Sequence, residues 1–203
     1  MTTELHEERL AAVVRAVGET GARTLLDLGC GSGDLILRLV LLPGITRITA
    51  LDTDLASLRP LQARLADLPT EVRAKVQIAQ ASMTVAHRNL RGHDCACLVE
   101  TIEHLPPGDL NRLERAVFAD MRPRHIIVTT PNAEYNPVLG VPPHRFRHPD
   151  HRFEWSRDRF GHWADGLAAR NGYTVMRRDV AGTHPTLGGA SQMALFRRSD
   201  QAP

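Results

Sequence analysis

The sequence predicts an α/β fold with a mostly parallel, seven-stranded sheet and helices on both faces. Three observations support this class: seven short apolar segments have the pattern of strands, one amphipathic segment precedes them and four lie between them, and a glycine-rich run follows the first strand directly. Strands that alternate with helices are typical of a parallel sheet covered on both sides. Because 203 residues is the length of one ordinary domain, we expect residues 1–203 to form a single domain.

Apolar residues recur at helical spacing in five segments, and short buried runs occur in seven others. The expected helices are residues 4–17, 34–42, 55–66, 108–118 and 157–171. The expected strands are residues 24–28, 47–51, 76–79, 96–99, 125–130, 173–178 and 192–197. Residues 131–156 are rich in proline, histidine and arginine and show no period, so we expect a long ordered insertion. Such loops are usually functional.

The composition indicates a soluble protein of the cytoplasm. Apolar residues make up 42% of the chain, and a net charge of +2 is too small to indicate nucleic-acid binding by itself. Lys75 is the single lysine; arginine suits contacts to phosphate, although genomic composition explains the skew more simply. Cys30, Cys95 and Cys97 form no disulfide or metal pattern, so we expect reduced thiols. We find no signal peptide and no membrane-spanning run.

The glycine-rich run predicts a ligand-binding turn. It reads Asp-Leu-Gly-Cys-Gly-Ser-Gly-Asp from Asp27 to Asp34, and glycines let a backbone turn sharply and approach a ligand closely. Asp52 ends the second strand about 20 residues on, where a carboxylate can bind ribose hydroxyls. One alternative is a tight turn with no ligand. Another is a dinucleotide site, but its Gly-x-Gly-x-x-Gly pattern needs glycine where this chain has Asp34.

With an acid placed just before alternating glycines, the run instead resembles the S-adenosylmethionine signature of Rossmann-like class I methyltransferases. The resemblance implies S-adenosylmethionine as cofactor, with the amino-acid part of the cofactor over the loop. The residues that we expect to bind it are Asp27, Gly29, Gly31, Gly33, Asp52 and Ser82.

A cluster of acids and a histidine follows the fourth strand. If the chain turns helically there, Glu100, Glu103 and His104 share one face at the carboxyl edge of the sheet, where ligands bind in this architecture. Two carboxylates that converge repel each other unless one is protonated or a cation binds, and a divalent ion resolves the repulsion. The alternative is a solvated helix start.

Four segments carry a more specific resemblance. Residues 100–105 (ETIEHL), 129–136 (TTPNAEYN), 150–157 (DHRFEWSR) and 191–198 (SQMALFRR) resemble the Hen-type methyltransferases, in the same order and over nearly the whole chain. That family methylates the 2′-hydroxyl of the terminal nucleotide at RNA 3′ ends. Its bacterial members act in RNA repair as part of a longer protein, with a polynucleotide kinase-phosphatase/ligase repair protein as partner. Its eukaryotic members act on small silencing RNAs.

The resemblance also implies a metal site and a mechanism. The family's metal-binding, catalytic residues map onto Glu100, Glu103, His104 and His151. Two imidazoles with two carboxylates tolerate Mg²⁺ and suit Mn²⁺ or Co²⁺ better. The ion is expected to bind the terminal 2′- and 3′-hydroxyls together; a metal-bound histidine is a poor base, so proton acceptance by His104 or His151 ranks second.

The insertion is expected to bind the RNA. Arg145, Arg147, Arg152 and Arg157, with Arg159 nearby, are placed to hold phosphates, and Phe146, Phe153 and Trp155 to stack on a base. The alternative is that the aromatic rings pack in the core and that the arginines pair with acids.

Two other functions remain open at this point. A small-molecule, catechol-type methyltransferase would have an apolar lid in place of the arginine-rich loop. A catalytically silent module would bind RNA 3′ ends without turnover.

Overall fold

The computed structural model describes residues 4–199, and a single seven-stranded sheet runs through them in the order β3-β2-β1-β4-β5-β7-β6. Six strands run in one direction, and β7 runs antiparallel to both of its neighbours, β5 and β6. The strands are β1 (Thr24–Leu28), β2 (Arg47–Asp52), β3 (Val76–Gln80), β4 (Cys95–Val99), β5 (His125–Pro131), β6 (Tyr173–Val180) and β7 (Ser191–Arg198). The expected sheet and its seven strands are confirmed.

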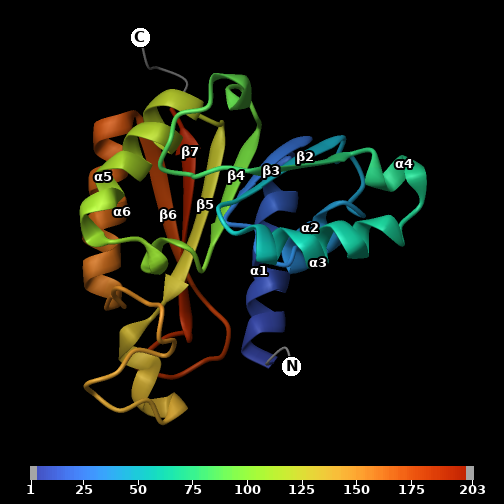
Figure 1. Ribbon diagram of the computed structural model, residues 1–203. Coiled ribbons are helices and arrows are strands. Elements are labelled where there is room, and N and C mark those ends of the chain that lie inside the picture. The colour runs from blue at the N-terminus through green and yellow to red at the C-terminus, as the bar shows by residue number, and fades with distance from the viewer. Residues whose placement is uncertain (1–3, 200–203) are drawn as a thin grey trace.

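Helices cover both faces of the sheet (Figure 1). Helices α1, α2 and α3 lie on one side of it, and α5 and α6 lie on the other. The helices are α1 (Glu4–Thr20), α2 (Asp34–Leu39), α3 (Leu55–Ala66), α4 (Thr70–Arg73), α5 (Leu110–Leu113) and α6 (Arg157–Asn171). Among residues 4–199, no helix is long and apolar enough to cross a bilayer.

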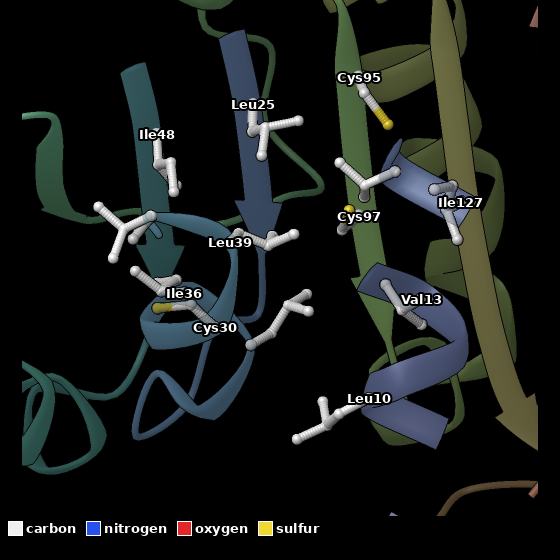
Figure 2. Packing of buried hydrophobic residues seen from close by; sticks show 14 of the residues in the cluster. Leu10, Val13, Leu25, Cys30, Ile36, Leu39, Ile48, Cys95, Cys97 and Ile127 are labelled. Atoms are coloured by element: carbon white, nitrogen blue, oxygen red, sulfur yellow. The ribbon is translucent and has the colours of Figure 1, made fainter. Parts of the chain in front are cut away.

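Alternation along the strands divides the core into two layers. Leu25 of β1 and Cys97 of β4 pack with α1 and α2, whereas Leu26 and Leu98, one residue further on in each strand, pack with α6 on the other side. Figure 2 shows the first layer, where side chains of β1, β2, β4 and β5 meet those of α1 and α2. All three cysteines are buried free thiols, as expected.

Three helices differ from their expected bounds. Helix α2, expected over 34–42, ends at Leu39. Helix α1 continues past Gly18 and ends at Thr20, since the left-handed residue that stops it is Gly21 (φ 66°). The helix expected at 108–118 is composite: a 3₁₀ turn at Pro107–Asp109 leads into α5, and a wider π turn follows over Glu114–Met121. Arg122, at φ 48°, closes it.

The strand order reverses between β1 and β4, which lie side by side. From β1 the chain continues to strands on one side of this pair, and from β4 it continues to strands on the other side. Ligands bind in such sheets at this reversal, outside the carboxyl ends of the strands. The glycine run follows β1 and the acid-histidine cluster follows β4, so the topology brings both predicted sites to one place. The insertion between β5 and α6 extends beyond the same end of the sheet (Figure 1).

Gly33 allows the turn into α2 to pack against α3. A Cβ at Gly33 would lie 2.3 Å from Leu61 Cδ1, and Leu61 is fully buried. Gly31 also has a positive φ, but open space surrounds its missing Cβ. Both changes to alanine cost about 1 kcal/mol for the left-handed backbone. We therefore expect Gly33→Ala to lower the free energy of unfolding in urea by about 1–3 kcal/mol more than Gly31→Ala does. Equal losses would contradict the close packing at Gly33.

Candidate functional site

The glycine run forms a tight turn whose first residue must be glycine. Gly29 has φ 84°, and a Cβ there would lie 2.5 Å from Cγ2 of Thr101, a residue of the loop after β4. The N–H groups of Gly29 and Cys30 donate to the Leu51 carbonyl of β2 at 2.8 and 3.0 Å. The turn is thus held against β2 and packed against the loop after β4.

Asp52 ends β2 beside this turn, as the sequence predicts. Its Oδ2 accepts a hydrogen bond from the Gly31 N–H at 2.8 Å, and its Oδ1 accepts one from the Asp54 N–H at 2.9 Å. The carboxylate therefore faces the glycine run and ties the ends of β1 and β2 together.

A cleft of about 560 Å³ joins the two predicted sites. This volume is ordinary for a small-molecule pocket. Its walls come from the loops after β1, β2, β3 and β4 and from the insertion. Of the predicted cofactor residues, Gly29, Gly31, Asp52 and Ser82 line it, together with Glu100, His104 and Asp150.

Asp27 lies beneath the turn and is almost fully buried. Its Oδ2 has no hydrogen-bond partner within residues 4–199. Burial, with a smaller contribution from the charge of Asp52, raises the pKa of Asp27 to about 7. A buried carboxyl group with an unused oxygen is suited to bind a cationic group placed over the turn.

In the loop after β4, the side chains of Glu100 and Glu103 point in a different direction from that of His104. The expected helical turn is a short 3₁₀ turn, Ile102–His104, preceded by Glu100 in the left-handed region at φ 50°. Glu103 points into the protein and is fully buried, whereas His104 is exposed. The three side chains therefore do not share one helix face, although they remain on one short loop.

Glu100 is held by β5, β7 and α1. Its Oε1 accepts from Thr129 Oγ1 at 3.0 Å, and its Oε2 lies 3.3 Å from Arg9 Nη1 and from Ser191 Oγ. Glu103 Oε2 accepts from Thr130 Oγ1 at 2.9 Å, and its Oε1 has no hydrogen-bond partner among the described residues. Burial and the charge of Glu100 raise the pKa of Glu103 well above its ordinary value.

Three imidazoles gather at the exposed end of the cleft. Ligand nitrogens of His104, His148 and His151 lie within 4.8 Å of one another, and the ring centroids of His104 and His151 are 4.9 Å apart. Burial, followed by His151 and His148, lowers the pKa of His104, which favours the neutral form that binds metals. The structure thus brings together two of the four predicted ligands and adds His148. Glu100 and Glu103 lie outside this group, bonded toward the sheet.

The chemistry of these donors fits a divalent cation. An unpaired oxygen of Glu103 with a raised pKa, and the imidazole of His104 with a lowered pKa, are each donors that a nearby cation would stabilise. Mixed nitrogen and oxygen donors suit Mn²⁺ or Co²⁺ and tolerate Mg²⁺.

Two aromatic residues expected to stack on RNA are part of the core instead. Phe153 and Trp155 are buried and stack on each other, with ring centroids 4.3 Å apart. Their alternation in sequence directs both rings inward where the chain rejoins the sheet, at a bridge between Asn132 and Trp155. Phe146 is exposed and remains available.

The arginines of the insertion divide into two groups. Arg147 is half-buried and donates to Asn136 and to the carbonyls of Ala190 and Asn132, and Arg157 pairs with Glu134. Their hydrogen bonds stabilise the insertion, so we no longer assign these two to RNA. Arg145 and Arg152 are exposed.

Sequence reasoning missed several residues that build this site. Arg9, Asn136 and Glu154 contact predicted site residues, yet sequence reasoning gave none of them a role. Arg9 belongs to no motif and lies far along the chain from Glu100. Asn136 and Glu154 lie within the resembling segments 129–136 and 150–157, which were the signal that could have found them.

Strand order and cleft together define the class I methyltransferase fold. A family model described as a methyltransferase domain matches residues 25–124. The methyltransferase domain of the bacterial protein CtHen1 superposes with a TM-score of 0.87 and 34% identity, over 96% of this chain and 99% of that one. The chain therefore belongs to the family of Hen1 methyltransferase domains.

Longer relatives agree with this assignment. The small RNA methyltransferase HEN1 has a TM-score of 0.85 and 31% identity, over 96% of this chain and 25% of that chain. A small RNA 2′-O-methyltransferase of Gallus gallus is 33% identical over 96% of this chain and 54% of its own length. The chain thus spans about half the length of the first curated relatives that it matches.

The buried carboxyl group of Asp27 predicts a pH-dependent stability. Its pKa in the folded protein is about 7, above the ordinary 3.8, so its stabilising contribution is complete below about pH 4 and is lost as the pH rises through 7. Asp27→Asn cannot ionise. In urea titrations without cofactor, we expect the free energy of unfolding of Asp27→Asn, minus that of the wild type, to increase from pH 4 to pH 8. A difference that stays constant from pH 4 to pH 8 would contradict the raised pKa of Asp27.

Proposed function

We propose that this chain transfers a methyl group from S-adenosylmethionine to the 2′-hydroxyl of the 3′-terminal nucleotide of RNA, with the help of a divalent ion. The observation that carries the proposal is the shared cleft, which has the glycine run and Asp52 at one end and Glu100 and His104 at the other. A methyl donor bound at one end and the hydroxyl group that accepts the methyl at the other would meet in one cleft, whose volume is that of a small-molecule pocket.

The end of the cleft near β1 and β2 suits the cofactor. Asp52 would accept hydrogen bonds from the ribose hydroxyls, and Gly29 and Gly31 would let the backbone approach the methionine part. Asp27, buried with one oxygen unpaired, would attract the ammonium group through its charge. Ser82 lies on the wall of the same cleft.

At the other end, Glu100, Glu103, His104 and His151 would hold the ion. The ion would lower the pKa of the 2′-hydroxyl and fix it beside the methyl donor. Glu103 would release its proton to the solvent when the cation binds, because the positive charge favours the carboxylate and offsets the burial and the charge of Glu100 that raise its pKa. Arg9 would neutralise part of the remaining negative charge through Glu100.

The exposed residues of the insertion would hold the RNA. Arg145 and Arg152 offer forked donors for phosphates, and Phe146 offers a free ring for a base. This charged surface favours RNA over a catechol-like substrate, which would need an apolar lid. A repaired RNA or a small RNA as natural substrate stays a prediction. The same holds for a polynucleotide kinase-phosphatase as partner.

Asp52 is expected to contribute to cofactor affinity. Loss of a hydrogen bond to a charged group typically costs about 1.5–3 kcal/mol, so Asp52→Ala should weaken S-adenosylmethionine binding at least about tenfold in calorimetry. Asp67→Ala is the control, because Asp67 is an exposed carboxylate at the carboxyl end of α3 and does not line the cleft. Equal affinities of wild type and a folded Asp52→Ala protein would remove Asp52 from the cofactor site.

The chemical nature of the RNA end tests the whole proposal. Methyl transfer would be measured, with Mn²⁺ or with a chelator, to four RNAs of one sequence that end in ribose, 3′-phosphate, 2′-deoxyribose or 3′-deoxyribose. We expect transfer only to the ribose end and only with the ion. The 3′-deoxy end keeps the nucleophile and loses one metal ligand, so its rate should fall about 10²-fold or more.

Three results would count against the proposal. Full activity after chelation would exclude the ion, and equal rates on ribose and 3′-deoxy ends would exclude the 3′-hydroxyl as a ligand. RNA binding without methyl transfer to any end would favour a silent end-binding module.

A further inference from the structure

Glu154 is a buried carboxylate in contact with one predicted metal ligand. Its side chain is 1% exposed, and its Oε1 lies 2.6 Å from Nδ1 of His151, which is itself 8% exposed. Either nitrogen of a neutral histidine can carry the ring proton, so this contact alone does not show which nitrogen of His151 is the donor. The other hydrogen bonds of Glu154 determine the position of that proton.

The hydrogen-bond roles follow in order from Arg147, whose guanidinium can only donate. Its Nε donates to Asn136 Oδ1 at 2.5 Å, so the amide nitrogen of Asn136 must be the atom that faces Glu154. That nitrogen donates to Glu154 Oε2 at 2.6 Å. The backbone N–H of Arg147 donates to Glu154 Oε1 at 2.7 Å. Both carboxylate oxygens therefore accept hydrogen bonds from groups that cannot accept in return.

This arrangement determines the tautomer of His151. Because Glu154 accepts at both oxygens, the short contact with His151 requires Nδ1 to carry the proton and donate it. In the neutral ring, Nε2 then keeps its lone pair, which is the form that binds a metal ion. A ligand nitrogen of His151 lies within 4.8 Å of one from His104.

The network is also fastened to the sheet. Arg147 Nη1 donates to the Ala190 carbonyl at 2.5 Å, and Nη2 donates to the Asn132 carbonyl. Asn132 and Ala190 flank the ends of β5 and β7, where they pair with each other through the backbone. His151 lies on an irregular segment, yet two hydrogen-bonded side chains connect its ring to the rigid strands.

We propose that Glu154, held by Asn136 and Arg147, is a positioning residue that keeps His151 in the Nδ1–H form with Nε2 directed to the ion. This inference rests on the proposed function, since it assigns His151 to the ion. It also reassigns Arg147, which the sequence placed among RNA contacts, to the support of a metal ligand.

Glu154→Gln tests the proposal with little change in volume. A glutamine has one acceptor oxygen and one donor nitrogen, whereas Arg147, Asn136 and His151 together present donors to both positions. Either Asn136 loses its partner or His151 faces an amide nitrogen and must accept at Nδ1, which places its proton on Nε2.

A matched control removes another carboxylate from the same segment. Glu134 fastens the 3₁₀ turn Ala133–Leu139 to α6 through Arg157, with hydrogen bonds of 2.8 and 3.1 Å from its guanidinium, and within residues 4–199 it forms no hydrogen bond with an imidazole. Glu134→Gln therefore loses a charge and structural hydrogen bonds without changing the partners of His151.

Two measurements on the full chain read the outcome. Calorimetry gives the affinity for Mn²⁺ alone, and two-bond ¹H–¹⁵N spectra of the metal-free protein, recorded at about pH 8.5, give the tautomer of His151. We expect the Nδ1–H form in the wild type and in Glu134→Gln. In Glu154→Gln a neutral amide replaces the carboxylate, so we expect Mn²⁺ affinity to fall about 10- to 100-fold, and we expect the Nε2–H form to gain population from the molecules in which the amide nitrogen faces His151.

The results separate this inference from the proposed function. An unchanged tautomer and Mn²⁺ affinity in Glu154→Gln would overturn the positioning role, even if the wild type methylates RNA. An equal loss of affinity in Glu134→Gln would also overturn it, because the effect would then be general loosening of the segment. Conversely, the expected tautomer change in a protein that transfers no methyl group would support the positioning role and contradict the proposed function.

Discussion

The contact between Gly29 and Thr101 is the constraint on which the site depends. The two residues belong to the loops after β1 and β4, and the space that a Cβ at Gly29 would need is occupied by the Thr101 methyl group. The strand order reverses between β1 and β4. The loops that follow these two strands therefore begin side by side and then turn toward opposite edges of the sheet, which is why they can be this close. The cleft is the space opened by that divergence. The glycine run and the loop after β4 therefore share a wall of the cleft.

Each end of the cleft holds a pair of carboxylates with one buried member. Asp27 is buried near Asp52, and Glu103 is buried near Glu100; in both pairs burial is the first cause of a raised pKa and the neighbouring charge is the second. Two neighbouring carboxylates are unfavourable when both are charged and one is buried, and a nearby cation would relieve both pairs. The proposed ligands supply one at each end: the cofactor carries an ammonium and a sulfonium group, and the ion carries two charges. The two halves of the site thus follow the same electrostatic principle.

The sequence was sufficient for the sheet, the glycine run and Asp52, because these depend on periodicity and on spacing along a short stretch of chain. It was insufficient for the insertion. Glu154 contacts Asn136 across 18 residues and Arg147 contacts Asn136 across 11, both through irregular backbone with no period to follow. The direction of a side chain in such a segment is set by tertiary hydrogen bonds, so Arg147 had the same appearance in sequence as the exposed Arg145. Phe153 and Trp155 show the same limit, since alternate residues in a loop point to a common side only where the chain rejoins a strand.

The insertion leaves the sheet and returns to it at one point. Asn132 pairs with Trp155 in a backbone bridge, and the Ala133 N–H donates to the Trp155 carbonyl at 3.0 Å. A loop whose ends already meet can change in length at a small entropic cost, because closure entropy grows only slowly with the number of residues. The strands beneath it would keep their register through such a change. This geometry makes the segment an exchangeable unit: residues between the two anchor points can be remodelled while β5, the glycine run and Asp52 keep their places.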